Sequence, residues 1–399
     1  MKKIVILTPR FPFPVIGGDR LRIYFLCKEL SKHFSLTLLS LCESKEEMEM
    51  DVSDDTVFDN IERVYMPKWR SYFNCLCCLP TKTPLQVAYY KNNEFQKKLI
   101  TLSKVNDAVF SHLVRVSEYT KNINLPKIIE LTDAISMNYE RVSGLAKSFG
   151  FKNLVYSLEQ SRLKKYEKSI ATKFDYSVLV SQIDKDYLFH PDDAVYERVL
   201  VCSNGVDTQT LSYEYGKGYK QLIFIGNLYS IQNLDAAYWF AKNVMPSLRE
   251  IDDYTFKIVG RIKSNDAKKF DQFDAVYLTG SVESILDEVR GSLAGICSVR
   301  LGAGVQNKIL EYMSLGIPTI TSSTGLEGIE ATPDKNILVA DKPSEYINAI
   351  LKLSKDATFA ETISLNARNY VVSKHSWGTR VLPVIKACKS LLIDNHIES

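Results

Sequence analysis

Long hydrophobic runs, paired cysteines and an excess of charge of one sign are all missing from this sequence of 399 residues. No stretch approaches the roughly 18 uninterrupted apolar residues of a membrane span, and the apolar run at 4–7 is too short for a signal-peptide core. The sequence therefore predicts a cytoplasmic chain whose contact with a membrane, if any, is peripheral. The formal net charge is only +3, so nucleic acid is not an expected partner.

Cysteine usage argues against both disulfides and a structural metal. The eight cysteines are spread along the chain, and in a reducing compartment they are not expected to pair. The Cys-x-x-Cys pair at 75–78 has neither a second pair nor a histidine at ligand spacing. Apolar residues make up 45% of the sequence and charged residues 24%, which is typical of a globular protein. The length predicts two domains.

Short β-branched runs alternate with amphipathic helical segments along most of the chain. A strand is predicted at 2–8, and a glycine pair and a helix follow it. After a polar stretch near 203–218 the same alternation begins again. We therefore predict an α/β protein with two doubly wound, Rossmann-like domains. The predicted boundaries are 1–202, 203–372 and a C-terminal helical segment at 373–399 that returns to the first domain.

The strongest local signal for a ligand site is the segment 300–318, which contains two glycines just before a predicted helix. Glycines let a ligand approach the backbone, and the N-terminus of a helix attracts phosphate. Lys308 can supply a positive charge, Glu311 one turn later can accept hydrogen bonds from a ribose, and Arg300 can contact phosphate. From these residues alone, a tight turn with a solvated lysine is an equally good interpretation.

Residues 302–328 (GAGVQNKILEYMSLGIPTITSSTGLEG) resemble the nucleotide-sugar-binding signature of the retaining glycosyltransferases of family 4, which have the GT-B fold. The resemblance covers nearly the whole chain and implies two Rossmann-like domains facing across a cleft. The supporting matches, in chain order, are PFPVIGGDRLR (12–22), VLVSQIDKDYL (178–188), NGVD (204–207), FIGNLYSIQNLDAAYWF (224–240) and IVGR (258–261).

The resemblance also implies roles for individual residues. Glu311 matches a glutamate that binds the nucleotide ribose, Lys308 a phosphate contact, and His112 a histidine near the donor sugar. Without the resemblance, His112 would be interpreted as a packed or surface histidine. Asp133 follows a predicted strand and is a candidate acceptor contact. The implied catalytic residues are His112, Arg261 and Lys308, and the implied donor-binding residues are Gly17, Gly18, Asn227, Arg300, Gly302, Ala303, Gly304, Val305 and Glu311.

Two features depart from the family pattern. The family has a glutamate eight residues before Glu311, where this chain has Ala303, so the donor sugar must be held differently. The usual arginine and lysine after the first strand of the second domain are also missing, since Asn227 and uncharged residues follow that strand. Arg261, together with Arg300 and Lys308, is then expected to neutralise the diphosphate without a metal. This arrangement resembles a subset of exopolysaccharide and O-antigen sugar transferases.

The resemblance implies a retaining glycosyltransferase that uses a UDP- or GDP-sugar as donor and needs no cofactor. The implied acceptor is a glycan or polyprenyl-linked oligosaccharide in the synthesis of a bacterial surface polysaccharide such as lipopolysaccharide. Two alternatives stay open at this stage. One is a nucleotide-sugar 2-epimerase of the same fold, and the other is a nucleotide-sugar-binding protein that lost catalysis with the change at Ala303.

Three weaker features lie outside the resemblance's main motifs. Asp184 and Asp186 form an Asp-x-Asp pair, a metal ligand in another glycosyltransferase fold, but the pair follows Ser181 into a predicted helix and a metal role is not expected. The acidic segment 43–59 predicts a solvated loop. The segment 68–82 combines aromatic and basic residues, which is compatible either with core packing or with an interfacial element at an anionic membrane.

Overall fold

The structure, a computed structural model, describes residues 1–16, 18–145, 151–208, 210–216, 220–282, 284–301 and 305–394. The chain divides into two compact units. The N-terminal unit comprises Met1–Asn204 together with the C-terminal segment from Arg380, and the C-terminal unit comprises Gly205–Thr379.

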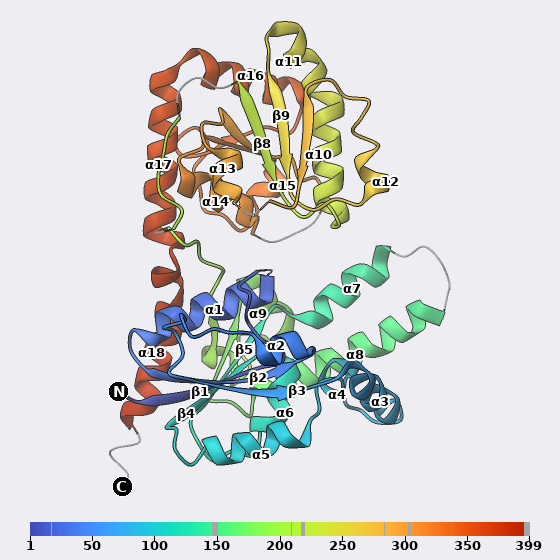
Figure 1. Cartoon of the computed structure of the whole chain (residues 1–399), viewed down its shortest axis with the longest axis vertical. Coiled ribbons are helices and arrows are strands. Elements are labelled where there is room, and N and C mark those ends of the chain that lie inside the picture. Colours follow the sequence, from blue (N-terminus) through green and yellow to red (C-terminus); the bar gives the residue numbers. More distant parts are fainter. Residues whose placement is uncertain are drawn as a thin grey trace. The chain divides into compact units, whose positions relative to one another are not determined.

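The N-terminal unit is built on a parallel sheet of seven strands in the order β3-β2-β1-β4-β5-β6-β7 (Figure 1). The chain moves outward from β1 through β2 and β3, and then returns to the other side of β1 with β4. Ligands of open α/β sheets bind at this kind of switch point, beyond the carboxyl ends of the strands. The strands are β1 (Lys3–Thr8), β2 (Ser35–Cys42), β3 (Asn60–Tyr65), β4 (Ala108–His112), β5 (Lys127–Thr132), β6 (Tyr176–Leu179) and β7 (Val199–Val201).

Helices connect these strands and cover the sheet. Leu391 and Cys388 of the C-terminal helix line a small void together with Ile4 and Val109 of the sheet. The end of the chain thus belongs to this unit. The helices are α1 (Gly18–Ser31), α2 (Lys45–Glu49), α3 (Lys68–Cys78), α4 (Leu85–Ala88), α5 (Asn93–Leu102), α6 (Ser117–Thr120), α7 (Ile135–Leu145), α8 (Phe151–Ala171), α9 (Gln182–Leu188) and α18 (Trp377–Asp394), with 3-10 turns at Val114–Val116 and Tyr196–Arg198. Among the described helices, none is both long enough and apolar enough to cross a membrane.

The acidic segment 43–59 is not entirely the loop that its composition predicts. It contains the short helix α2, whose first turn is capped because Ser44 accepts a hydrogen bond from the backbone N–H of Glu47. The edge strand β3, directly after this segment, is also absent from the sequence prediction. An edge strand is only half buried and carries polar residues on one face, so it lacks the apolar run that marks the inner strands.

The C-terminal unit has a parallel sheet of six strands in the equivalent order, β10-β9-β8-β11-β12-β13. The predicted architecture of two doubly wound sheets is therefore confirmed. The strands are β8 (Gln221–Ile225), β9 (Thr255–Val259), β10 (Val276–Gly280), β11 (Ala294–Cys297), β12 (Thr319–Thr321) and β13 (Leu338–Val339). The helices are α10 (Ile231–Asn243), α11 (Met245–Ile251), α12 (Ser264–Ala267), α13 (Ile285–Val289), α14 (Asn307–Leu315), α15 (Ser323–Leu326), α16 (Pro343–Lys355) and α17 (Ala357–His375).

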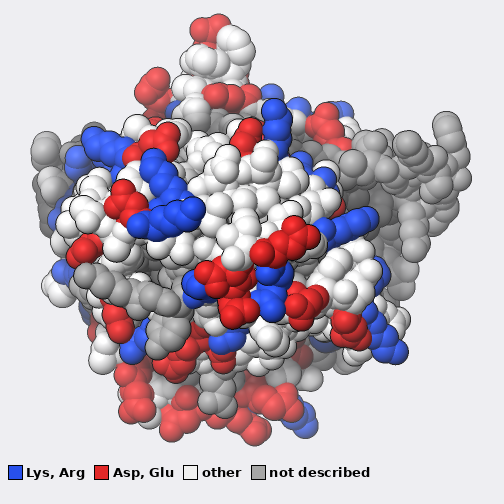
Figure 2. All heavy atoms as spheres, turned by 90° about the horizontal axis from the view of Figure 1, so that it is seen from above, with Lys and Arg blue, Asp and Glu red and all other residues white. Residues whose placement is uncertain are grey.

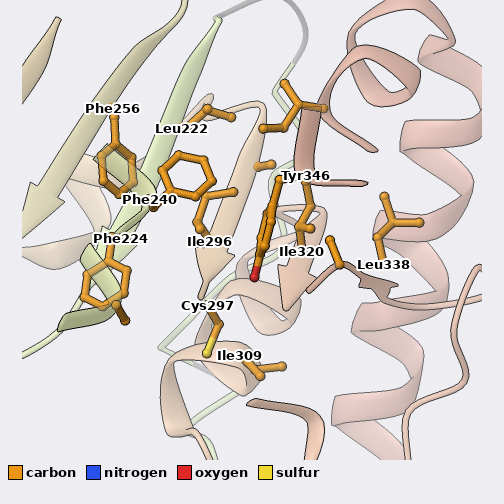
Figure 3. Packing of buried hydrophobic residues seen from close by; sticks show 14 of the residues in the cluster. Leu222, Phe224, Phe240, Phe256, Ile296, Cys297, Ile309, Ile320, Leu338 and Tyr346 are labelled. Carbon is orange, nitrogen blue, oxygen red and sulfur yellow. The ribbon is translucent and has the colours of Figure 1, made fainter. Parts of the chain in front are cut away.

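Aromatic rings from the sheet and its covering helices form the core of the C-terminal unit (Figure 3). Phe240 of α10 lies with its ring centroid 4.6 Å from that of Phe256 on β9 and 5.5 Å from that of Tyr346 on α16. All three side chains are buried. Offset and edge-to-face contacts of this kind add to the free energy gained by burying the rings, so the sheet forms a rigid base for the loops at its carboxyl edge.

Tyr312 docks helix α14 onto this sheet. Its ring lies directly over Gly295 of β11, where a Cβ atom would come within 2.4 Å of it. Its hydroxyl accepts a hydrogen bond of 2.7 Å from the backbone N–H of Ile225, the last residue of β8. The N-terminal turn of α14 is thereby held at the carboxyl ends of the central strands.

We predict that Tyr312→Phe lowers the free energy of unfolding of this unit by about 1–3 kcal/mol. The substitution removes the hydroxyl that accepts a hydrogen bond from the buried backbone N–H of Ile225. Tyr346→Phe is the matched control. The hydroxyl of Tyr346 is also buried but has no hydrogen-bond partner among the described residues, so its removal should cost nothing. Urea unfolding followed by circular dichroism measures both, and equal midpoints for the two variants would contradict the prediction.

Candidate functional site

The loops after β8 and β9 are in direct backbone contact at the carboxyl edge of the C-terminal sheet. Gly260 has a φ of +142°, and a Cβ atom there would lie 2.0 Å from the carbonyl oxygen of Gly226. The backbone N–H of Leu228 donates to the carbonyl of Arg261 at 2.8 Å. These contacts hold Asn227 and Arg261, both predicted from the sequence, on neighbouring loops.

Lys308 is a buried cation at the start of α14. Its Nζ donates to Oδ1 of Asn233 at 2.6 Å and lies 4.3 Å from the ring centroid of Phe224. Burial lowers the pKa of Lys308, because the charged ammonium is removed from water. Across the described part of the chain, no carboxylate lies within ion-pair distance of it. Such a group is well suited to bind an incoming anion.

Glu311 lies one turn after Lys308 on the same helix and is partly buried. Burial raises the pKa of Glu311, and the nearby charge of Lys308 acts in the opposite direction. The carboxylate can accept hydrogen bonds from neighbouring hydroxyl groups. Asn233, which the sequence analysis did not identify, belongs to the same cluster, since its amide also donates to the carbonyl of Asn227 at 3.0 Å. Its position inside the 224–240 match is the only sequence signal for it.

The other basic side chains at this edge of the sheet differ in whether they have an ion-pair partner. Arg300 is paired with Asp235 at 2.7 Å and lies over the ring of Trp239, so its guanidinium is occupied. Arg261 is exposed and lies 6.0 Å from the ring centroid of Tyr229. Lys263, another residue that the sequence analysis did not single out, lies 5.7 Å from the same ring.

Several residues predicted for donor binding cannot be placed. Gly17, Gly302, Ala303 and Gly304 lie outside the described residues. Val305, which follows them, is partly buried and packs against the core of the C-terminal unit.

In the N-terminal unit, His112 lies at the end of β4 and is buried. Its Nδ1 is 2.6 Å from Oε2 of Glu130 on β5, and the other oxygen of Glu130 accepts a hydrogen bond of 2.8 Å from Nε of Arg22 on α1. The sequence analysis did not predict Arg22 or Glu130. The available signal was a charged residue inside the apolar strand 127–132.

Glu130 is an ionised carboxylate in the interior. Burial by itself would raise the pKa of Glu130, but the charge of Arg22 and the hydrogen bond to His112 outweigh that effect and hold the pKa at about 2. The carboxylate is therefore charged at every pH at which the protein is expected to be folded.

Gly18 begins α1 beside the end of β1. A Cβ atom on Gly18 would meet no atom of the described residues within 4 Å, so packing against them does not require glycine there. The next residue, Asp19, lies 3.6 Å from Arg10. Both of these charged residues and Arg20 line a small hollow together with His112.

The acidic residues after β5 and β6 are engaged within the protein. Asp133 accepts a hydrogen bond from the amide of Asn138, and burial raises the pKa of Asp133. Asp184 is buried, accepts from the backbone N–H of Ala134 at 2.9 Å and contacts the hydroxyl of Ser181. Its role is to connect two loops. Within the described ranges, no group of three or more His, Cys, Asp and Glu side chains is arranged to hold a metal ion.

We predict that Glu130 makes the stability of the N-terminal unit depend on acidic pH. Its pKa falls from about 4.3 in an unfolded chain to about 2 in the folded protein. The resulting stabilisation is present above about pH 4.3 and is lost as the pH falls toward 2. It amounts to about 3 kcal/mol. The difference in melting temperature between the wild type and Glu130→Gln should therefore shrink as the pH falls from 5 toward 2, and a constant difference would contradict the prediction.

Comparisons with known proteins bear on the whole chain. Residues 219–356 match the family described as glycosyl transferases group 1. A protein of Klebsiella pneumoniae described as an uncharacterized 44.6 kDa protein in cps region is 23% identical over 389 residues, which cover 93% of this chain and 96% of that protein.

Solved structures show the same fold at low sequence identity. Sucrose-phosphate synthase from Thermosynechococcus elongatus is 14% identical with a TM-score of 0.68, covering 99% of this chain and 100% of that one. Anabaena HepE, in complex with UDP and glucose, is 15% identical with a TM-score of 0.66, covering 98% of this chain and 100% of that one. The resemblance seen in the sequence is thus confirmed: the chain has the GT-B fold, and its C-terminal unit carries the group 1 glycosyl transferase match.

Proposed function

We propose that this protein is a retaining glycosyltransferase that transfers a sugar from a nucleotide diphosphate sugar to a glycan or lipid-linked acceptor. The observation that carries the proposal is the buried ammonium of Lys308, which has no ion-pair partner among the described residues, with Glu311 one turn later, inside the segment that matches the family. The relative in a cps region fits polysaccharide synthesis, and the HepE complex with UDP and glucose fits a nucleotide-sugar donor.

Different residues of the C-terminal unit bind the diphosphate and the ribose of the donor. Lys308, Arg261 and the free N–H groups at the start of α14 stabilise the charge that develops on the departing diphosphate, and Glu311 accepts hydrogen bonds from the ribose. No metal ion is needed for this charge balance. Arg300 can contact a phosphate once its ion pair with Asp235 is broken. Backbone contacts come from the segment Gly302, Ala303, Gly304 and Val305 and from Asn227.

The N-terminal unit supplies contacts to the sugar and the acceptor. The glycine pair Gly17 and Gly18 admits the substrate close to the backbone, and the open space around Gly18 supports this role. His112 contacts a sugar hydroxyl. Asp133 is the proposed acceptor contact, since it lies directly after β5.

The proposal is tested by incubating the protein with labelled UDP-glucose, UDP-galactose and GDP-mannose, with and without a glycan acceptor and EDTA. A transferase consumes one donor faster with acceptor, EDTA leaves the rate unchanged, and NMR of the product shows the anomeric configuration of the donor. An epimerase changes the sugar without any acceptor, and a binding protein changes none. Either of these outcomes, or inversion of the anomeric centre, overturns the proposal.

We predict that Lys308→Ala and Glu311→Ala each weaken binding of the donor nucleotide roughly 5- to 150-fold, the effect of losing a hydrogen bond to a charged group. Isothermal titration calorimetry with UDP and GDP measures this. Lys355→Ala, which removes an exposed lysine from the end of α16, is the matched control and should bind like the wild type. Wild-type affinity in both test variants would show that the nucleotide binds elsewhere.

An exposed apolar face on α3 supports our proposal that the protein contacts a membrane there. Four large side chains at helical spacing, Trp69, Tyr72, Phe73 and Leu76, are between 61% and 71% exposed, which excludes core packing as the explanation for this segment. Lys68 at the start of the helix and Lys82 after it are exposed as well. An apolar helix face flanked by lysines favours the interface of an anionic bilayer.

A cavity of about 460 Å³ lies beside the opposite edge of α3 and is lined by Asn74, Cys77 and Cys78 of that helix. Lys91 and Arg115 line it too, and neither has a carboxylate partner among the described residues. Arg115 also donates to Oε1 of Gln86 at 2.9 Å, and Glu118 lines the same cavity. Lys91 and Arg115 are the groups that we propose to contact the phosphates of a lipid-linked acceptor.

The face of the C-terminal unit around α11 and α16 has a different character. Figure 2, which views the molecule from above Figure 1, shows Lys and Arg mixed with Asp and Glu, and acidic side chains predominate along its lower edge. Attraction to an anionic membrane requires a local excess of Lys and Arg. We therefore assign the membrane contact to α3.

We predict that the protein sediments with phosphatidylglycerol vesicles at low salt and is released at high salt, because only a few cations contribute roughly 1 kcal/mol each. The double variant Trp69→Ala/Phe73→Ala should stay in the supernatant. The control Ile231→Ala/Tyr277→Ala removes two comparably exposed side chains of the C-terminal unit and should sediment normally. Equal recovery of the wild type and the α3 variant would contradict the prediction.

A further inference from the structure

Glu130 joins His112 to Arg22 in a chain of buried hydrogen bonds. All three side chains are at most 3% exposed. Arg22 is held on its other side as well, because its terminal nitrogens donate to the carbonyl of Cys202 at 2.8 Å and to Oδ1 of Asn204 at 2.9 Å. The guanidinium thus cannot turn away from Glu130 without breaking several hydrogen bonds, and it keeps the carboxylate in one orientation.

The hydrogen bonds to Glu130 decide which nitrogen of His112 carries the proton. Oε2 of Glu130 faces Nδ1 of His112 at 2.6 Å and also accepts from the hydroxyl of Thr132 at 3.0 Å. An ionised carboxylate can only accept hydrogen bonds, so Nδ1 must be the donor. In the neutral ring, Nε2 is then a hydrogen-bond acceptor.

Arg22 is the ion-pair partner of Glu130, so the two buried charges of this cluster are balanced. The charged groups around the hollow are also balanced, since Arg10 pairs with Asp19 at 3.6 Å and Arg20 pairs with Glu47 at 2.6 Å.

Nε2 of His112 has no partner within the described residues although it is buried. His112 lines the small hollow that it shares with Arg10, Asp19 and Arg20. A buried acceptor without a partner costs free energy, and a substrate hydroxyl would satisfy it. The hollow has no room for a water molecule in this structure, so a hydroxyl reaches Nε2 only when neighbouring side chains such as those of Arg10 or Arg20 move.

The backbone beside both residues is strained. Leu113, directly after His112, has a φ of +67°, and Thr132, two residues after Glu130, has a φ of +66°. Residues with side chains rarely adopt this left-handed conformation, and such strain is concentrated at functional sites. The strain at the ends of β4 and β5 supports a site at this place over a merely structural ion pair.

We propose that Glu130 is a positioning residue that holds His112 with the proton on Nδ1, so that Nε2 accepts a hydrogen bond from a hydroxyl of the sugar substrate. Arg22 in turn holds Glu130. The identity of the ligand as a sugar rests on the proposed function, whereas the proton position on His112 does not.

The test is Glu130→Gln in the full-length chain. The glutamine oxygen must still accept from Nε of Arg22, so its amide nitrogen faces Nδ1 of His112 as a donor. The proton of His112 should therefore move to Nε2. Nitrogen-15 NMR of the imidazole rings distinguishes the two tautomers. His375 is a buried internal control, since its Nε2 lies 2.8 Å from the hydroxyl of Tyr370 and its spectrum should not change.

Kinetics with the nucleotide sugar that the transferase assay selects supply the second readout. Glu130→Gln should lower kcat about 10- to 100-fold, the range seen when a metal-ligating histidine loses the partner that orients it, and should leave the donor KM within about twofold. The matched control Glu159→Gln changes another buried carboxylate, which accepts from the backbone N–H of Leu85, and should retain wild-type kcat.

Each outcome decides the proposal. It is overturned if wild-type His112 carries its proton on Nε2, or if Glu130→Gln moves the proton without lowering kcat. Should Glu130→Gln fail to fold, the wild-type protein decides instead: the Nε2 resonance of His112 must shift on addition of the donor, and an unchanged resonance overturns the proposal. If no nucleotide sugar is turned over, the proposed function fails, while the wild-type tautomer still tests the link between Glu130 and His112.

Discussion

The N-terminal unit depends on the buried ion pair between Arg22 and Glu130. A charge in the protein interior is tolerated only when it is paired and its remaining hydrogen-bonding groups are satisfied. Arg22 meets this requirement by using three nitrogens on three segments, namely β5, Cys202 after β7, and Asn204. One side chain of α1 thereby fixes the start of that helix, the strand that carries Glu130, and the ring of His112.

In the C-terminal unit the buried cation has no ion-pair partner among the described residues. Its sheet has the equivalent strand order, and Tyr312 holds α14 at the carboxyl edge. Lys308 there has an amide and an aromatic ring as neighbours in place of a carboxylate. An ion pair neutralises its charge internally, whereas an amide leaves most of the positive charge available. The one unit therefore uses its buried charge to position a histidine, and the other keeps a cation ready for an anionic ligand.

Several features could be predicted from the sequence because they depend on local spacing. The alternation of apolar runs and helical segments predicts both sheets, and the three-residue spacing of Lys308 and Glu311 places them one turn apart on any helix. His112 could be singled out only through the family resemblance. Arg22 and Glu130 were missed because the atoms they join are 108 residues apart, and a periodic pattern carries no information about such pairs.

The sequence by itself determined the α/β class, the two repeats of the strand–helix pattern and the loops at the strand ends, since burial of parallel strands on both faces leaves a strong apolar signal. Only the tertiary structure decided the pairing of each charge. It paired Arg300 with Asp235 and left Lys308 without an ion-pair partner among the described residues. It also turned the aromatic side chains of α3 toward solvent. Coulomb and hydrogen-bond partners are set by distance in space, and folding alone brings residues that are far apart in the sequence within that distance.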